Sequence, residues 1–122
     1  MARGNATAAL LLALCCAAAA AVIVHGKDWP VGDGKGWTFG VAGWEKGKSI
    51  PRGDTLVFKY KPKYHNVVEV DRAGYDGCKV SGPAKVYKSG DDRIELNGGE
   101  AFFICSISDH CAKGMKIAVT AA

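Results

Sequence analysis

The chain has 122 residues, of which 16 are Lys or Arg and 12 are Asp or Glu, giving a net charge of +4. The basic residues are spread along the sequence and no aromatic–basic motif accompanies them, so we expect no nucleic-acid partner. A domain of this size buries only a moderate share of its surface, so an additional stabilising cross-link is expected.

Residues 1–26 have the features of a secretory signal peptide. A nearly unbroken apolar run from Ala8 to Val24 is short for a membrane span and is followed by polar, turn-rich sequence. We expect cleavage after Gly26, with a cut within residues 17–21 as the alternative. The mature chain is then one domain, residues 27–122. It ends without a hydrophobic tail, so we expect a secreted, extracellular or apoplastic protein with no membrane anchor.

Short apolar or alternating runs separated by turn residues predict strands along the whole mature chain. These runs lie at residues 29–31, 37–39, 55–60, 65–70, 84–87, 92–96, 100–107 and 115–120. Asn97-Gly98-Gly99 is a hairpin signal between two of them, and residues 72–79 are expected to carry a short helical turn. Seven or eight short strands over this length indicate an all-β antiparallel sandwich.

Three cysteines remain once the leader is removed: Cys78, Cys105 and Cys111. In an oxidising compartment this odd number predicts one disulfide and one unpaired thiol. Any two of the three can form the pair on this evidence alone. A free thiol outside the cell oxidises unless burial or a metal ion protects it.

The mature chain has only two histidines, His65 and His110, and one methionine, Met115. Cys105, His110 and Met115 follow one another at intervals of five residues, so one loop between two strands can bring them together. Taken singly, each residue is more typical of ordinary packing. Taken together, they use every histidine and methionine of the mature chain and the leftover thiol, so we predict that they form one metal site with His65.

A thiolate, two imidazoles and a weak thioether are the ligand set of a blue-copper electron-transfer site. Cu(I) prefers soft sulfur donors and Cu(II) prefers harder nitrogen donors, and this mixed set suits both oxidation states of one copper ion. The four ligands leave no position for a substrate, which favours electron transfer over enzymatic chemistry. Zinc is a weaker interpretation, because a thioether is a poor zinc ligand.

At this point the sequence resembles the phytocyanins, plant blue-copper proteins of the cupredoxin fold, and among them the plantacyanins or basic blue proteins. The resembling stretches are Gly36–Phe39, Tyr64–Val68, Pro83–Tyr87, Phe103–Cys105 and His110–Val119. The resemblance implies a cupredoxin-like Greek-key sandwich over residues 27–122. It also implies copper ligands at His65, Cys105, His110 and Met115. It further implies a disulfide between Cys78 and Cys111, the pair left over when Cys105 binds metal.

Many phytocyanins carry Pro-Gly before the second histidine ligand, whereas this chain has Asp109 there. A carboxylate beside His110 should stabilise the more positive Cu(II) state, so we predict that Asp109→Gly raises the reduction potential. Lys61, Lys63 and Lys113 lie close in sequence to the predicted ligands. They are either ordinary solvated lysines or a basic rim that attracts an acidic redox partner.

Two other functions are compatible with the sequence. The first is an extracellular signalling or cell-wall binding module, in which copper only stabilises the scaffold. The second is an enzyme with Cys105 as nucleophile and His110 as base, which is disfavoured because no residue that would orient the base is evident. We expect a monomer whose redox partner the sequence does not identify.

Overall fold

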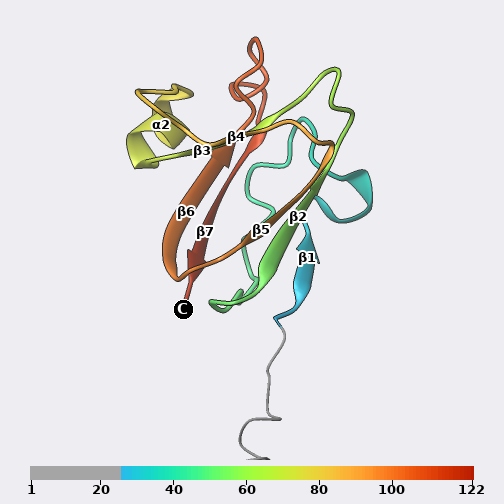
Figure 1. The fold of residues 1–122 in the computed structure, drawn as a ribbon, viewed down its shortest axis with the longest axis vertical. Helices are drawn as coiled ribbons and strands as arrows, with labels where there is room; N and C mark the ends of the chain where they lie inside the picture. The colour runs from blue at the N-terminus through green and yellow to red at the C-terminus, as the bar shows by residue number, and fades with distance from the viewer. Residues whose placement is uncertain (1–25) are drawn as a thin grey trace, which may run out of the picture.

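The computed structural model describes residues 26–122, so the predicted signal peptide lies outside the described residues except for Gly26. Two sheets face each other across one core (Figure 1). The elements are β1 (Asp28–Pro30), η1 (Asp33–Lys35, a 3-10 turn), β2 (Thr55–Lys59), β3 (Val67–Val70), α2 (Arg72–Gly77), β4 (Val86–Tyr87), β5 (Asp91–Glu95), β6 (Gly99–Ile104) and β7 (Lys116–Ala121).

The first sheet has the strand order β1-β2-β5 and the second has the order β4-β3-β6-β7. β1 runs parallel to β2, and the other neighbouring strands are antiparallel. The predicted all-β sandwich of seven to eight strands is confirmed, with seven strands in the described part of the chain.

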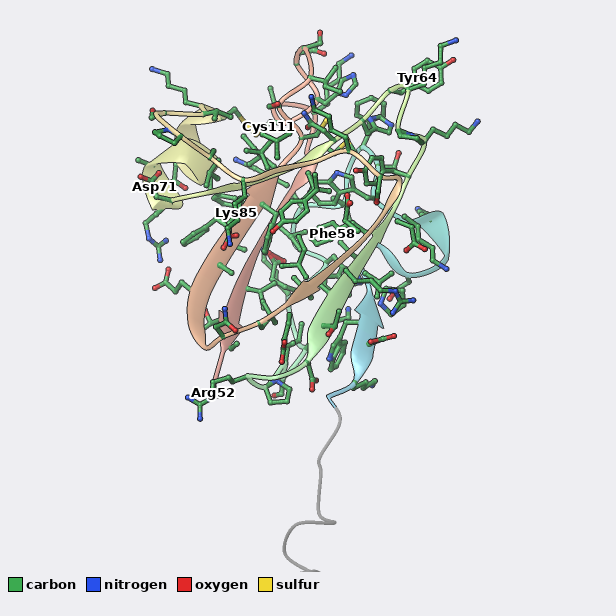
Figure 2. All side chains as sticks on the ribbon, in the orientation of Figure 1. Arg52, Phe58, Tyr64, Asp71, Lys85 and Cys111 are labelled. Carbon is green, nitrogen blue, oxygen red and sulfur yellow. A yellow bond between two sulfur atoms is a disulfide. The ribbon has the colours of Figure 1, made fainter. Side chains whose placement is uncertain are left out.

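The core between the sheets is built around three aromatic side chains. The Trp37 and Phe58 rings meet edge to face with centroids 5.0 Å apart, and Phe103 lies 5.2 Å from Phe58. All three side chains are almost completely buried, and Figure 2 shows Phe58 between the sheets. Each such ring removes a large apolar area from water, so this cluster is a main source of the sandwich's stability.

The predicted hairpin at Asn97-Gly98-Gly99 is wrong. β5 pairs with β2 in one sheet, with Ile94 opposite Leu56, whereas β6 pairs with β3 and β7 in the other. Gly98 and Gly99 have φ of 98° and 76°, so the turn has the positive φ expected of these glycines. This turn carries the chain from the first sheet, which contains β5, to the second sheet, which contains β6. Buried side chains of both strands then face the core between the sheets.

The predicted strand at residues 37–39 is also wrong. Gly36 and Gly40 have φ of 74° and 73° and bracket this segment with turns. The Trp37 N–H donates a hydrogen bond to the Lys59 carbonyl at 2.9 Å, but no ladder continues from it in the described structure. Residues 37 and 39 would lie on the same face of a strand, whereas here Trp37 is buried and Phe39 is exposed.

The predicted helical turn near residues 72–79 is confirmed as α2. Asp71 caps it, because its carboxylate accepts a hydrogen bond from the Gly74 N–H at 2.7 Å. Tyr75 of α2 packs on a second, smaller apolar cluster outside the sandwich. The buried members of that cluster are Val68, Ile104 and Cys111.

No helix in the described residues is both long enough and apolar enough to span a membrane.

Candidate metal centre

The four predicted ligands lie at strand ends or in a loop that joins two strands, at the end of the sandwich opposite the C-terminus (Figure 1). His65 stands two residues before β3, at the end of a turn in which its N–H donates to the Lys61 carbonyl at 3.1 Å. Cys105 directly follows β6 and Met115 directly precedes β7. His110 lies in the loop that joins these two strands.

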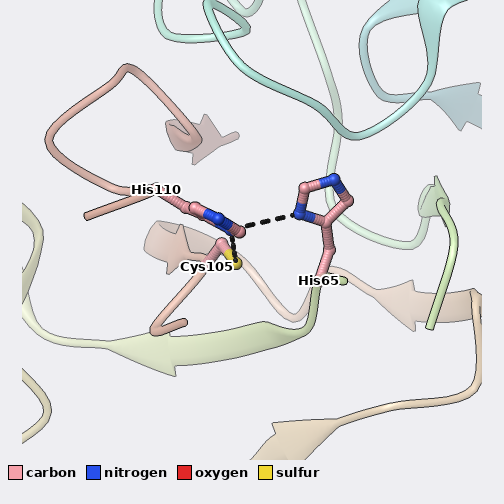
Figure 3. Close-up of side chains that lie close together, drawn as sticks. All are labelled: His65, Cys105 and His110. Atoms are coloured by element: carbon pink, nitrogen blue, oxygen red, sulfur yellow. Dashed lines mark hydrogen bonds between the residues drawn. The ribbon is translucent and has the colours of Figure 1, made fainter. Parts of the chain in front are cut away.

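Three of the predicted ligands converge. The Nδ1 atoms of His65 and His110 are 3.2 Å apart, and the Cys105 Sγ atom is 3.5 Å from the His110 Nδ1 atom (Figure 3). One donor atom from each of the three residues lies within 4.8 Å of the others. Cys105 is the free thiol of the described chain and is fully buried, whereas both histidines are partly exposed.

Backbone hydrogen bonds bring Met115 to the same loop base. The Cys105 N–H donates to the Met115 carbonyl at 3.0 Å, and the Met115 N–H donates to the His110 carbonyl at 3.1 Å. The Met115 side chain is fully buried in the same apolar cluster as Cys105. Met115 therefore lies near the other predicted ligands of this loop.

The pKa of His65 is lowered by burial and, to a smaller extent, by the nearby His110 ring. Both effects favour the neutral imidazole, which is the form that binds a metal ion. Two imidazole nitrogens facing each other at 3.2 Å either share one proton between them or share one cation.

Asn66 and Ser106 join the segments that carry His65 and Cys105. The buried Asn66 side chain accepts from the Ser106 N–H and donates to the Ser106 hydroxyl, both at 2.9 Å. Its backbone carbonyl accepts from the Trp37 indole N–H at 2.9 Å. The sequence analysis missed this link, although each of the two residues directly follows a predicted ligand.

Phe39 was also missed as a neighbour of the site. Its ring meets the imidazoles of His65 and His110 edge to face, with centroids 5.5 and 4.8 Å away. Phe39 is 45% exposed, so these ring contacts lie at the protein surface. The sequence holds no local signal for this contact, because Phe39 is distant from both histidines along the chain.

The disulfide joins Cys78, at the end of α2, to Cys111, the residue after His110. This is the pair that the sequence analysis predicted. Cys111 is buried and packs against the outer face of the second sheet. The loop that carries His110 is therefore tied both to β6 and β7 and to α2.

The charged residues near the site are exposed. Asp109, beside His110, forms an ion pair with Lys113 at 3.4 Å. Lys35, Lys59 and Lys61 line a shallow cleft of about 530 Å³ that reaches His65. Of the three lysines of the predicted rim, Lys61 lines this cleft, Lys113 pairs with Asp109, and Lys63 lies near the exposed Tyr64 ring.

The donor set fits a metal ion of copper's chemistry. Nitrogen atoms 3.2 Å apart can both bind one ion at metal–nitrogen distances of about 2.0–2.1 Å without moving. A buried thiol, two imidazoles and a buried thioether match the soft and borderline ligands that copper prefers. A structural zinc site would use four strong nitrogen, sulfur or oxygen ligands, and here the fourth candidate is a thioether.

Comparison with known proteins agrees with this geometry. Residues 37–115 match the family model described as a plastocyanin-like domain. The chain is 59% identical to chemocyanin from Lilium longiflorum, over 75% of this chain and 73% of that protein. It is 52% identical to a basic blue protein from Arabidopsis thaliana, over 80% of this chain and 76% of that protein.

Among solved structures, the cucumber basic protein, a blue copper protein, superposes with a TM-score of 0.77 at 47% identity. The match covers 78% of this chain and 99% of the cucumber protein. The chain therefore belongs to the plastocyanin-like family, among the basic blue proteins that its sequence resembles.

Proposed function

We propose that this protein is a blue-copper electron carrier that holds one copper ion with His65, Cys105, His110 and Met115. The observation that carries the proposal is the convergence of two imidazole nitrogens and a buried thiol within 4.8 Å. The ion supplies one-electron chemistry by alternating between Cu(I) and Cu(II).

The protein's contribution is a frame that keeps the donors in place. Asn66 and Ser106 fix the segments of His65 and Cys105 relative to each other. The backbone pairing of Cys105 with Met115 fixes the base of the loop, and the disulfide at Cys111 fixes its outer side. Donors that are already close before the metal binds need little rearrangement between oxidation states, which favours fast electron transfer.

The same four side chains argue against an enzyme. If all four bind the ion, a substrate finds no open position on it. Two of the donors, Cys105 and Met115, are fully buried, so a substrate has access only from the histidine side. Electron exchange through the partly exposed histidine edges fits this arrangement better than bond-making chemistry.

We infer that the redox partner is acidic. Lys35, Lys59 and Lys61 line the cleft beside His65, and one acidic residue, Asp33, lies among them. Such a surface attracts an anionic reagent at a rate that falls with ionic strength. Replacing Lys61 with Gln should slow electron exchange with an anionic oxidant at low salt, and an unchanged rate would remove the claim.

The proposal includes secretion of a monomeric domain, residues 27–122, after removal of residues 1–26. The disulfide supports an oxidising compartment, because such bonds persist in extracellular proteins. Mass spectrometry of the protein secreted from plant cells tests the cleavage site and the extracellular or apoplastic location.

The deciding experiment compares visible absorption of the copper-loaded wild type and Cys105→Ser. The wild type should show an intense thiolate-to-copper charge-transfer band, and Cys105→Ser should be colourless. Met115→Gln is the matched variant, which should keep the band with an altered shape because it changes only the weak ligand. A colourless wild type would overturn the proposal, and a colourless variant that keeps full biological activity would favour the scaffold function.

A further inference from the structure

Phe39 is an exposed aromatic residue whose ring contacts are concentrated on the metal-site histidines. Its ring stands nearly perpendicular to both imidazoles, at 85° to His65 and 87° to His110. The two imidazoles lie at 66° to each other with centroids 5.0 Å apart. One ring therefore touches both histidines from outside and restricts how each can tilt.

The loop that carries Phe39 is fastened to the ligand loop. The Gly40 N–H donates to the Lys113 carbonyl at 3.1 Å, and the Ala42 N–H donates to the Gly114 carbonyl at 2.9 Å. The two backbones approach so closely that a Cβ atom at Gly114 would lie 3.2 Å from the Gly40 Cα atom. Phe39 thus keeps its position relative to the segment between His110 and Met115.

A charged pair borders the ring on its open side. The Lys113 ammonium lies 5.8 Å from the Phe39 ring centroid and 3.4 Å from the Asp109 carboxylate. Such a cation favours a location over an aromatic face. The ring is therefore held by the Gly40 backbone, the imidazoles and Lys113 together.

We propose that Phe39 is a positioning residue that fixes the His65 and His110 imidazoles in the arrangement that binds the metal. The proposal deepens the proposed copper-binding function and rests on it for the metal-loaded readouts. The positioning itself is a property of the metal-free protein. Because nearly half of the ring is exposed, its removal should affect the histidines more than the folded state.

The test compares Phe39→Leu with Phe39→Tyr and with Tyr64→Leu. Leu keeps apolar bulk but has no ring edge or face, whereas Tyr keeps the ring and can direct its hydroxyl to solvent. Tyr64 is the matched control. It is 52% exposed and adjacent to His65, but within the described residues its ring lies against the Lys63 ammonium and stacks on no imidazole. It projects away from the molecule (Figure 2).

Two readouts separate positioning from stability. In the metal-free protein, NMR should show exchange-broadened His65 and His110 ring signals in Phe39→Leu, while the signals of the rest of the folded domain stay sharp. In the copper-loaded protein, EDTA should bleach Phe39→Leu about tenfold faster than the wild type, because two edge-to-face contacts are lost. Phe39→Tyr and Tyr64→Leu should behave like the wild type in both assays.

The inference is overturned if Phe39→Leu keeps sharp imidazole signals and the wild-type bleaching rate. It is also overturned if Tyr64→Leu produces the same changes. If the wild type never becomes blue, the proposed function fails, and the metal-free NMR comparison still decides the role of Phe39.

A second inference concerns the first residue of the predicted mature chain. The Lys27 backbone nitrogen lies 2.9 Å from the Asp54 carboxylate, which also accepts from the Trp29 indole N–H at 2.7 Å. Asp54 is only 6% exposed. The Lys27 carbonyl accepts from the Thr55 N–H at 2.9 Å, so Lys27 is already fixed to the sheet.

We infer that cleavage of the Gly26–Lys27 bond creates a terminal ammonium that pairs with Asp54 and strengthens this edge of the sandwich. In the hydrolysis, water gives its hydroxyl to the Gly26 carbonyl and a proton to the Lys27 nitrogen, and the new amine takes a further proton from solvent. The other charged groups here are the Lys27 side chain over the Trp29 ring and an exposed Asp28–Arg93 ion pair.

The hydrogen bonds from Trp29 and Lys27 lower the pKa of Asp54, so its contribution to stability is present above its ordinary pKa and is lost as the pH falls through the lowered value. Pairing with the carboxylate requires the protonated amine, whose ordinary pKa is about 7.7, so this contribution should be present at pH 6 and absent at pH 10.

The test uses chains that begin at Lys27 with a free or an acetylated amine, each with Asp54 or with Asp54→Asn. At pH 6 the free-amine protein should melt about 4 °C higher than the acetylated one, and the gap should close at pH 10 and in Asp54→Asn. A gap that persists in Asp54→Asn or at pH 10 would overturn the inference. A secreted protein that begins at another residue would also overturn it.

Discussion

Asn66→Ala should weaken the fold and disturb the metal site together. The substitution removes both side-chain hydrogen bonds to Ser106, each 2.9 Å long, while the backbone carbonyl that accepts from Trp37 remains. A hydrogen bond of this kind contributes about 0.5–1.5 kcal/mol. Ser106 is exposed and its freed groups can bind water, so we expect a loss of about 2 kcal/mol.

Urea unfolding of the metal-free protein measures this loss, and the melting temperature should fall by about 8–16 °C for a domain of this size. Ser106→Ala removes only the bond to the hydroxyl and should cost about 1 kcal/mol. It should add almost nothing in the Asn66→Ala background, because the partner of the Ser106 hydroxyl is then already absent. Asn97→Ala, in an exposed turn, is the control.

In the copper-loaded protein, Asn66→Ala should also broaden and shift the visible band, since the segments of His65 and Cys105 lose their direct link. A loss below about 0.5 kcal/mol, or one equal to that of Asn97→Ala, would refute the reasoning. Full additivity of the Asn66 and Ser106 substitutions would refute it as well.

Three further predictions concern other parts of the molecule. Replacing both Cys78 and Cys111 with Ala opens a loop of 33 residues and should lower the free energy of unfolding by about 3–4 kcal/mol. Urea unfolding measures this loss, with Cys105 left unchanged in both proteins. Asp109→Gly should raise the reduction potential by a small amount, because Lys113 already offsets part of the carboxylate charge; a voltammetric shift of zero or downward would contradict this. Arg93→Ala removes an exposed ion pair and should change the free energy of unfolding by less than about 1 kcal/mol, as thermal unfolding would show.

The strands and the donor residues were predictable for different reasons. Strand positions follow from short apolar or alternating runs between turn residues, which is why residues 55–60, with an apolar run from Leu56 to Phe58, closely match β2. The donors stood out because the mature chain has so few histidines, methionines and cysteines. Neither signal specifies which strands pair, and the Asn97–Gly99 turn was therefore predicted as a hairpin. The hairpin is excluded because β5 pairs with β2, with Ile94 opposite Leu56, and these two residues are distant in sequence.

The supporting residues could not be predicted because their roles exist only in the folded chain. Asn66 reaches Ser106 across 40 positions, and Phe39 reaches His110 from a loop that has no regular periodicity. An asparagine beside a histidine and an exposed phenylalanine are common in any sequence. The link between Asn66 and Ser106 depends on the register of β3 with β6, where Val68 stands opposite Ile104.

The five-residue spacing of the predicted ligands follows from the register of β6 and β7. Ile104 lies opposite Lys116, and the next step of the same ladder sets Cys105 opposite Met115, with the Cys105 N–H bonded to the Met115 carbonyl. The connecting loop therefore has His110 at its midpoint, and the hydrogen bond from the Met115 N–H to the His110 carbonyl holds His110 close to the base of the loop. His65 lies just before β3, which pairs with β6. The register of these strands, which apolar packing determines, therefore also determines which side chains meet around the metal.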